Sequence, residues 1–230
     1  MKVVAVSPHL DDAAFSAGGT IARHARDGDE VVLVTCFTGN VARPTGFALA
    51  CHLDKGLSAD VDYMALRRVE DVAACAVIGA MPVHLPFLEA PHRGYDSAPA
   101  LFGARLAGDD MADRFAPALA LLVADADLIL GPLGIGDHVD HHHVRDALAR
   151  VADPSRTLLW EDWPYLDRVD RVPPDPALTV NLDPELVEKR IAICAAYTTQ
   201  LGFQFGGRDA MEARLRLIRV ERFHRLSTPL

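Results

Sequence analysis

The first residues suited to catalysis occur early in the chain, where residues 7–12 (SPHLDD) carry one imidazole and two carboxylates. His9 and Asp12 are three residues apart, so a helical turn would bring both side chains to one face, about 5–6 Å apart at Cβ. One metal ion could bind both of them. Asp11 lies between them and cannot fully share that face, which places it beside the metal as a base for a water molecule.

A second stretch, residues 136–141 (GDHVDH), repeats this spacing far downstream. It places His138 and His141 three residues apart. Two imidazoles and one carboxylate form a three-ligand set that leaves a position open for water, which is typical of catalytic rather than structural zinc. We therefore expect His9, Asp12 and His141 to bind zinc. Fe(II) suits the same ligands, because cellular availability as well as affinity decides occupancy.

These residue types predict metal-assisted hydrolysis of an amide. A zinc ion would lower the pKa of water towards about 7, and Asp11 would take the proton. His138 would stabilise the oxyanion that forms or protonate the leaving amine. Asp140 is the expected orienting group for the His138 imidazole, since carboxylates commonly hold the histidines of metal sites in place.

Each stretch follows an apolar run that we expect to be a buried parallel strand, at residues 2–6 and 128–130. In an open α/β sheet, ligands bind outside the carboxyl ends of the strands. Loops that are distant in the sequence can meet there. The two strands therefore predict that both stretches contribute to one site.

The rest of the chain alternates between strand and helix patterns. Further strands are expected at residues 31–37, 83–87, 156–161, 178–182 and 220–226. Helices are expected at 20–27 (opened by the glycine pair 18–19), from 60 or 62 to 79, 110–124, 139–151, 184–197 and 211–217, with a short helical turn near 48–53. This alternation indicates a Rossmann-like, doubly wound α/β fold with a mostly parallel sheet and helices on both faces. Without an evident linker or repeat, residues 1–230 are expected to form one domain.

The composition of the chain indicates which binding partners and which cellular compartment to expect. Lysine and arginine number 23 and aspartate and glutamate 32, so the net charge is −9 with neutral histidines. Without a basic block, neither nucleic acid nor an anionic membrane is an expected partner. The apolar run before His9 is too short for a signal peptide, and no run reaches the roughly 18 residues that span a bilayer, so we expect a cytoplasmic protein. The four cysteines lack CxxC spacing and are expected to be buried free thiols.

The same motifs resemble those of the LmbE-like, or PIG-L-type, zinc-dependent N-deacetylases. The family motif P-H-x-D-D-E matches residues 8–13, with Ala13 in place of the usual acidic residue, and H-P-D-H matches residues 138–141. Further matches extend the resemblance over nearly the whole chain, at Gly18–Thr20, Arg67 and Glu70, 89–93, 161–165, and Tyr197 and Gln200. Gly136 stands where some sugar deacetylases of the family carry tyrosine, so no phenol from that position is expected in the site.

The resemblance implies a role for each matched residue. It implies zinc ligation by His9, Asp12 and His141, with Asp11 as the general base. It implies that His138 is the electrophilic or acid histidine. It also implies that two arginines, Arg67 and Arg93, contact the polar groups of the substrate.

Three functions remain open from the sequence. The leading hypothesis is removal of an N-acetyl group from an N-acetylated amino sugar or a related small metabolite. An amidase that cleaves a larger N-acyl group or a thiol conjugate would use the same machinery with a different pocket. A non-catalytic Rossmann-like binding module would instead use the 18–19 glycine turn for an anion, although no phosphate-binding fingerprint is present. A homo-oligomer is compatible with the sequence, which does not set the number of subunits.

Overall fold

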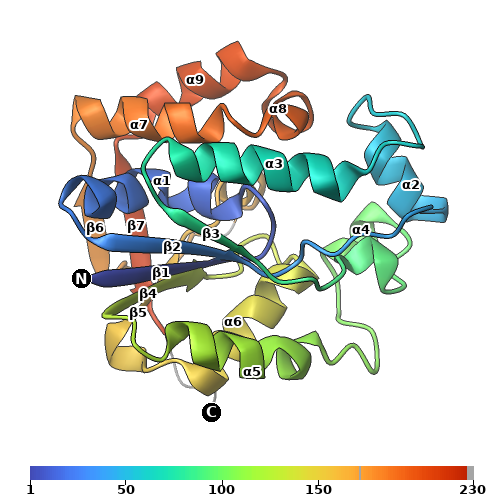
Figure 1. The fold of residues 1–230 in the computed structure, drawn as a ribbon, viewed down its shortest axis with the longest axis horizontal. Helices are drawn as coiled ribbons and strands as arrows, with labels where there is room; N and C mark the ends of the chain where they lie inside the picture. The colour runs from blue at the N-terminus through green and yellow to red at the C-terminus, as the bar shows by residue number, and fades with distance from the viewer. Residues whose placement is uncertain (171, 227–230) are drawn as a thin grey trace.

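A computed structural model describes residues 1–170 and 172–226. These residues form a seven-stranded sheet with the order β3-β2-β1-β4-β5-β7-β6 (Figure 1). Strands β3, β2, β1, β4 and β5 run parallel, whereas β7 is antiparallel to both β5 and β6. The strands are β1 (Lys2–Ser7), β2 (Glu30–Thr35), β3 (Met81–His84), β4 (Leu128–Pro132), β5 (Thr157–Trp160), β6 (Leu178–Asn181) and β7 (Val220–Arg225).

Helices cover both faces of the sheet, which confirms the predicted Rossmann-like, doubly wound α/β fold. One face carries α1, α3, α7, α8 and α9, and the other carries α5 and α6 (Figure 1). The helices are α1 (Asp12–Arg26), α2 (Gly46–Leu53), α3 (Tyr63–Ala76), α4 (Ala98–Leu101), α5 (Met111–Val123), α6 (Val139–Val151), α7 (Pro184–Cys194), α8 (Thr198–Phe205) and α9 (Arg208–Leu217), with 3₁₀ turns η1 (Ala90–His92), η2 (Pro154–Arg156) and η3 (Tyr165–Arg168). No helix among the described residues is long and apolar enough to cross a membrane.

The apolar run of β1 reflects burial on both sides. Val3 and Ala5 pack into the core beneath α1 and α7, whereas Val4 and Val6 pack into the core beneath α5 and α6. Successive side chains of a strand point to opposite faces. Because both faces are covered, the consecutive positions 3–6 of the strand are all apolar rather than every second one.

The start of α1 differs from the prediction. The helix begins at Asp12 rather than near residue 20, so Gly18 and Gly19 lie inside it. A Cβ on Gly19 would come within 2.6 Å of the Leu182 side chain, and one on Gly18 within 3.3 Å of Arg190. The glycine pair therefore allows α1 to approach α7 and the segment after β6, and it does not form a turn beside the metal motif.

The strand order places the two motifs together. From β1 the chain continues to β2 and β3 on one side of the sheet, and it later returns to β4 and β5 on the other side. The carboxyl ends of β1 and β4 therefore flank the point where the winding direction changes, which is where open α/β sheets bind ligands. Both motifs begin at these strand ends.

Candidate active site

His9, Asp12 and His141 come together as the sequence predicts. The Nδ1 atom of His9 lies 3.0 Å from Oδ2 of Asp12, and Nε2 of His141 lies 3.2 Å from the same oxygen. All three side chains are buried. One ligand atom from each lies within 4.8 Å of the others, which is a geometry that can hold a metal ion.

The outward-facing nitrogens of the two histidines are held by carboxylates. His141 Nδ1 lies 2.8 Å from Oδ1 of Asp162, and His9 Nε2 lies 2.9 Å from Oδ2 of Asp140. Such contacts fix the tautomer so that the other ring nitrogen is free to bind a metal. The Nε2 atom of His141 is indeed buried and makes no hydrogen bond, although Oδ2 of Asp12 lies 3.2 Å away. The residues therefore fit a divalent metal with two nitrogen ligands and one oxygen ligand.

A second group with suitable spacing, His9, His138 and Asp140, fits a metal less well. Its only carboxylate already accepts hydrogen bonds from Arg93, at 2.8 Å, and from the backbone N–H of Ala90, at 3.0 Å. The guanidinium of Arg93 supplies the positive charge that a metal would otherwise bring. We therefore place the candidate metal site at the group that contains Asp12.

Asp11 lies beside this group in a strained backbone conformation. Its φ angle is 153°, a region that residues other than glycine rarely occupy, and such strain is often retained at functional sites. Burial raises the pKa of its carboxyl group to about 7, while the Arg67 guanidinium, 3.4 Å away, acts in the opposite direction. A carboxyl group with a pKa near neutrality can both accept and return a proton.

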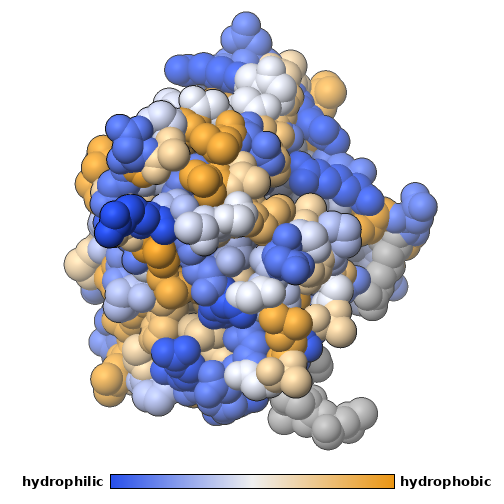
Figure 2. Space-filling model, turned by 90° about the vertical axis from the view of Figure 1, so that its right-hand side faces the viewer, coloured by the Kyte–Doolittle hydropathy of each residue, from blue (hydrophilic) through white to orange (hydrophobic). Residues whose placement is uncertain are grey.

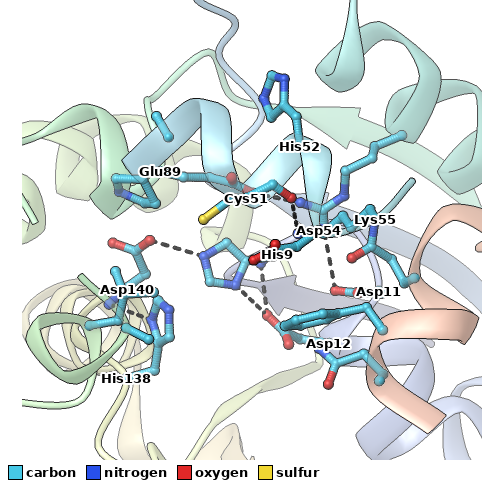
Figure 3. A pocket seen from close by; sticks show the side chains of 18 of the residues that line it. His9, Asp11, Asp12, Cys51, His52, Asp54, Lys55, Glu89, His138 and Asp140 are labelled. Atoms are coloured by element: carbon cyan, nitrogen blue, oxygen red, sulfur yellow. Dashed lines mark hydrogen bonds and ion pairs between the residues drawn. The ribbon is translucent and has the colours of Figure 1, made fainter. Parts of the chain in front are cut away.

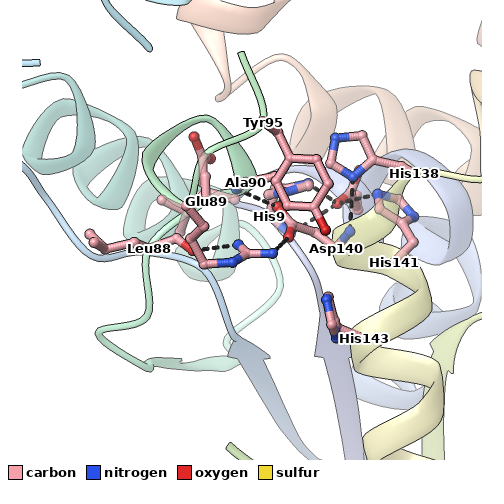
Figure 4. A network of polar contacts seen from close by, with 12 residues as sticks. His9, Leu88, Glu89, Ala90, Tyr95, His138, Asp140, His141 and His143 are labelled. Carbon is pink, nitrogen blue, oxygen red and sulfur yellow. Dashed lines mark hydrogen bonds and ion pairs between the residues drawn. The ribbon is translucent and has the colours of Figure 1, made fainter. Parts of the chain in front are cut away.

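His138 is neutral and presents a donor. It caps the N-terminus of α6, and its Nδ1 accepts the backbone N–H of Asp140 at 3.2 Å. Its Nε2 must therefore carry the hydrogen. Burial lowers the pKa of His138 well below its usual range. The expected contact to the Asp140 carboxylate is wrong, because that carboxylate binds His9 and Arg93 instead, so the backbone of Asp140 orients His138 (Figure 4).

The two arginines occupy different places. Arg67 lines the cavity next to the metal group, which is our term for His9, Asp12 and His141. Its guanidinium donates to Glu89 at 2.6 Å and to the carbonyl of Leu10 at 3.1 Å. Arg93 is absent from the cavity lining. It donates to Asp109 and Asp140, at 2.9 Å and 2.8 Å, and so stabilises the Asp140 carboxylate without lining the cavity itself. The expected substrate contact by Arg93 therefore has no counterpart in this arrangement.

The cavity in front of the metal group has a volume of about 240 Å³ (Figure 3). Besides His9, Asp11, Asp12, His138 and Asp140, it is lined by side chains that the sequence did not single out individually, including Phe47, His52, Lys55, Tyr63, Phe102, Tyr165 and Phe203. On the face that carries α2 and α4, hydrophobic residues lie in small groups among hydrophilic ones (Figure 2). Asp162 was also not assigned, although it follows the carboxyl end of β5 and the same strand-end rule could have found it.

Comparison with known proteins agrees with these motifs. The family model described as GlcNAc-PI de-N-acetylase (PIG-L) matches residues 4–152, which include both metal motifs. The chain belongs to the PIG-L family. This membership confirms the resemblance noted in the sequence.

Individual relatives carry deacetylase names. A 2'-N-acetylparomamine deacetylase of Streptomyces fradiae is 34% identical over 175 residues, which cover 74% of this chain and 60% of that protein. A 1D-myo-inositol 2-acetamido-2-deoxy-alpha-D-glucopyranoside deacetylase of Corynebacterium glutamicum is 26% identical, with 87% and 75% covered. The structure of a deacetylase triple mutant from the teicoplanin biosynthetic pathway superposes with a TM-score of 0.80 at 26% identity, covering 98% of both chains. These likenesses support the predicted fold, and the PIG-L family description supports the reaction class.

Proposed function

We propose that this protein removes the acetyl group from an N-acetylated amino sugar, with a divalent metal held by His9, Asp12 and His141. The observation that carries the proposal is the buried Nε2 of His141, which forms no hydrogen bond and lies 3.2 Å from Oδ2 of Asp12. Asp12 and the adjacent Asp11 line the cavity, so a metal position and a proton acceptor would lie side by side there. Related proteins named as deacetylases of N-acetylated amino sugars support the choice of bond.

Zinc is the metal that we propose, and Fe(II) suits the same nitrogen and oxygen ligands. When bound, the metal would polarise the amide carbonyl and acidify water. Asp162 and Asp140 would hold the two ligating imidazoles in orientation through the contacts described above.

Asp11 and His138 would perform the proton transfer and the charge stabilisation. Asp11 takes a proton from the water whose oxygen attacks the acetyl carbonyl carbon. The Nε2–H group of His138 donates a hydrogen bond to the carbonyl oxygen as negative charge develops there. Asp11 then returns its proton to the nitrogen as the carbon–nitrogen bond breaks, which yields acetate and the free amine.

The remainder of the cavity would bind the sugar. Arg67 faces the cavity with a guanidinium that can donate to sugar hydroxyls. The aromatic rings of Tyr63, Phe102 and Phe203 offer apolar faces for a sugar ring. These contacts support a small N-acylated molecule as the substrate.

Acetate release tests the proposal directly. Purified protein would be incubated with 2'-N-acetylparomamine and a panel of N-acetylglucosaminyl compounds, before and after chelation and again after addition of zinc. We expect release from at least one compound, loss on chelation and recovery with zinc. Failure of the metal-loaded protein to release acetate from any of them would contradict deacetylation of these sugars. Release of a longer acyl group instead would favour the amidase.

A further inference from the structure

The four tyrosines of the chain differ in what their hydroxyl groups contact. Tyr63 accepts from Gln200, Tyr95 binds Asp109 and Tyr197 binds Asp71, at 3.0, 2.8 and 2.8 Å. The Tyr165 hydroxyl has no hydrogen-bond partner within residues 1–170 and 172–226, although Tyr165 is only 9% exposed and lines the cavity. A mostly buried phenol without a protein partner is available to a ligand.

The ring of Tyr165 stands against the histidines of the site. It meets His141 edge to face with the ring centroids 5.1 Å apart, and its centroid lies 6.3 Å from that of His138. A tyrosine hydroxyl, whose usual pKa is about 10, is a neutral O–H donor at physiological pH. The Tyr165 phenol can therefore donate a hydrogen bond to a ligand in the cavity that it lines.

Gly136 makes room for this ring. A Cβ on Gly136 would lie 2.8 Å from Cβ of Tyr165 and 3.2 Å from its Cγ, which is too close for any other residue. The φ angle of Gly136 is also positive, at 89°. Because Gly136 has no side chain, the Tyr165 ring from the loop after β5 can enter the site.

The same loop holds the metal ligand. Asp162 contacts His141 and also accepts the backbone N–H groups of Gly134 and Ile135, at 2.7 and 2.9 Å. Tyr165 follows three residues later, at the start of η3. One anchored loop therefore orients a metal ligand and positions the phenol, which is the rigid support that a preorganised donor requires.

We propose that Tyr165 is a catalytic residue whose hydroxyl donates a hydrogen bond to the acetyl oxygen of the substrate, together with the donor on His138. This inference rests on the proposed deacetylase function. Two donors would then hold the oxygen on which negative charge develops. A fixed donor at such a position contributes about 10²–10³-fold to kcat.

The test compares Tyr165→Phe with Tyr197→Phe, which removes a buried phenol outside the cavity. We expect Tyr165→Phe to lower kcat by about 10²-fold, with KM within about twofold and zinc content unchanged. Tyr197→Phe should lower the thermal stability and leave kcat unchanged, because its hydroxyl binds Asp71 rather than substrate. An unchanged kcat in Tyr165→Phe would overturn the assignment.

Acetate binding supplies a readout that needs no turnover. Titration calorimetry of the zinc-loaded proteins with acetate should give at least roughly tenfold weaker binding to Tyr165→Phe, because the variant loses a hydrogen bond to a charged carboxylate. Equal affinity would overturn the donor role. If the wild-type protein releases no acetate from any sugar, the proposed function fails, and this titration still decides whether Tyr165 contacts the oxygen.

Discussion

The two walls of the cavity differ in how their side chains are held. The inner wall, at the ends of β1 and β4, presents His9, Asp11, Asp12 and His138 to the cavity, and the buried His141 packs next to His138. Each is at most 8% exposed, and each contacts a further polar group. The outer wall, from α2, α4 and α8, includes Phe47, Phe102 and Phe203. Phe102 and Phe203 are 40% and 54% exposed.

This difference indicates that the inner wall carries out the reaction and that the outer wall recognises the substrate. Catalytic groups need a fixed geometry, and the contacts behind the inner wall provide it. Exposed side chains on short helices can change between relatives without disturbing the sheet. We infer that the inner wall sets the bond that is cleaved and that the outer wall sets the size and shape of the substrate. Each substitution below tests one wall or its support.

The largest effect is expected from Asp11→Asn on the inner wall. An amide cannot accept the proton of the attacking water, so kcat should fall by about 10²–10⁴-fold. The metal content should remain, because Asp11 is not among the proposed ligands. Steady-state kinetics and elemental analysis check this, with the exposed Asp209→Asn in α9 as the matched control. Activity close to that of the wild type would show that another group is the base.

Arg93→Met tests the support behind the inner wall. It would leave the fully buried Asp140 without its guanidinium partner. Loss of one partner from a buried ion pair costs about 3–5 kcal/mol of unfolding free energy. Urea denaturation should show this loss. A change below about 1 kcal/mol, the range of surface pairs, would contradict the role assigned to Arg93.

Asp162→Ala tests the carboxylate that holds His141. Removing such a partner typically weakens metal binding about 10–100-fold. Competition with a chromophoric zinc chelator measures the change. Because Asp162 also accepts two backbone N–H groups, Asp162→Asn serves as the more conservative comparison. Wild-type zinc affinity in both variants would show that Asp162 does not contribute to metal binding.

The smallest effect is expected on the outer wall, from Phe203→Ala. Aromatic contacts contribute about 0.5–1.5 kcal/mol, so KM should rise roughly 2- to 10-fold while kcat stays within about twofold. Leu121→Ala, at an 81% exposed position of α5, is the control. A large fall in kcat with unchanged KM would show that Phe203 acts in the reaction and not in substrate binding, which contradicts the role inferred for the outer wall.

The sheet could be predicted because its strands are buried. All seven predicted strand segments overlap the observed strands, since runs such as residues 3–6 are apolar at every position. The helices were harder to predict. The first two turns of α1 and the whole of α8 were missed, because glycines and polar residues there obscure the helical pattern and packing determines the structure. The structure also places Pro117 inside α5, whose predicted bounds were nearly correct.

Ligand spacing could also be predicted, whereas ion-pair partners could not. Spacing and strand ends singled out His9, Asp12 and His141 as candidate ligands because both features are local in the sequence, and the structure brings one ligand atom of each within 4.8 Å of the others. The partners of Arg93 depend on how residue 109 and α6 approach each other in three dimensions. Arg67 and Glu70, three residues apart, likewise contact different partners, Glu89 and Thr199. Charged side chains that share a helix need not pair with each other.

We propose that the inner wall binds a catalytic metal. The decisive measurement is elemental analysis of the purified wild-type protein beside Asp12→Ala, because Asp12 provides the oxygen that both histidines approach. We predict about one zinc or iron per wild-type chain and its loss from Asp12→Ala, together with loss of acetate release. A wild-type protein that contains no metal after anaerobic, chelator-free purification would show that the inner wall holds no catalytic metal. An Asp12→Ala variant that keeps its metal would show that Asp12 is not a ligand.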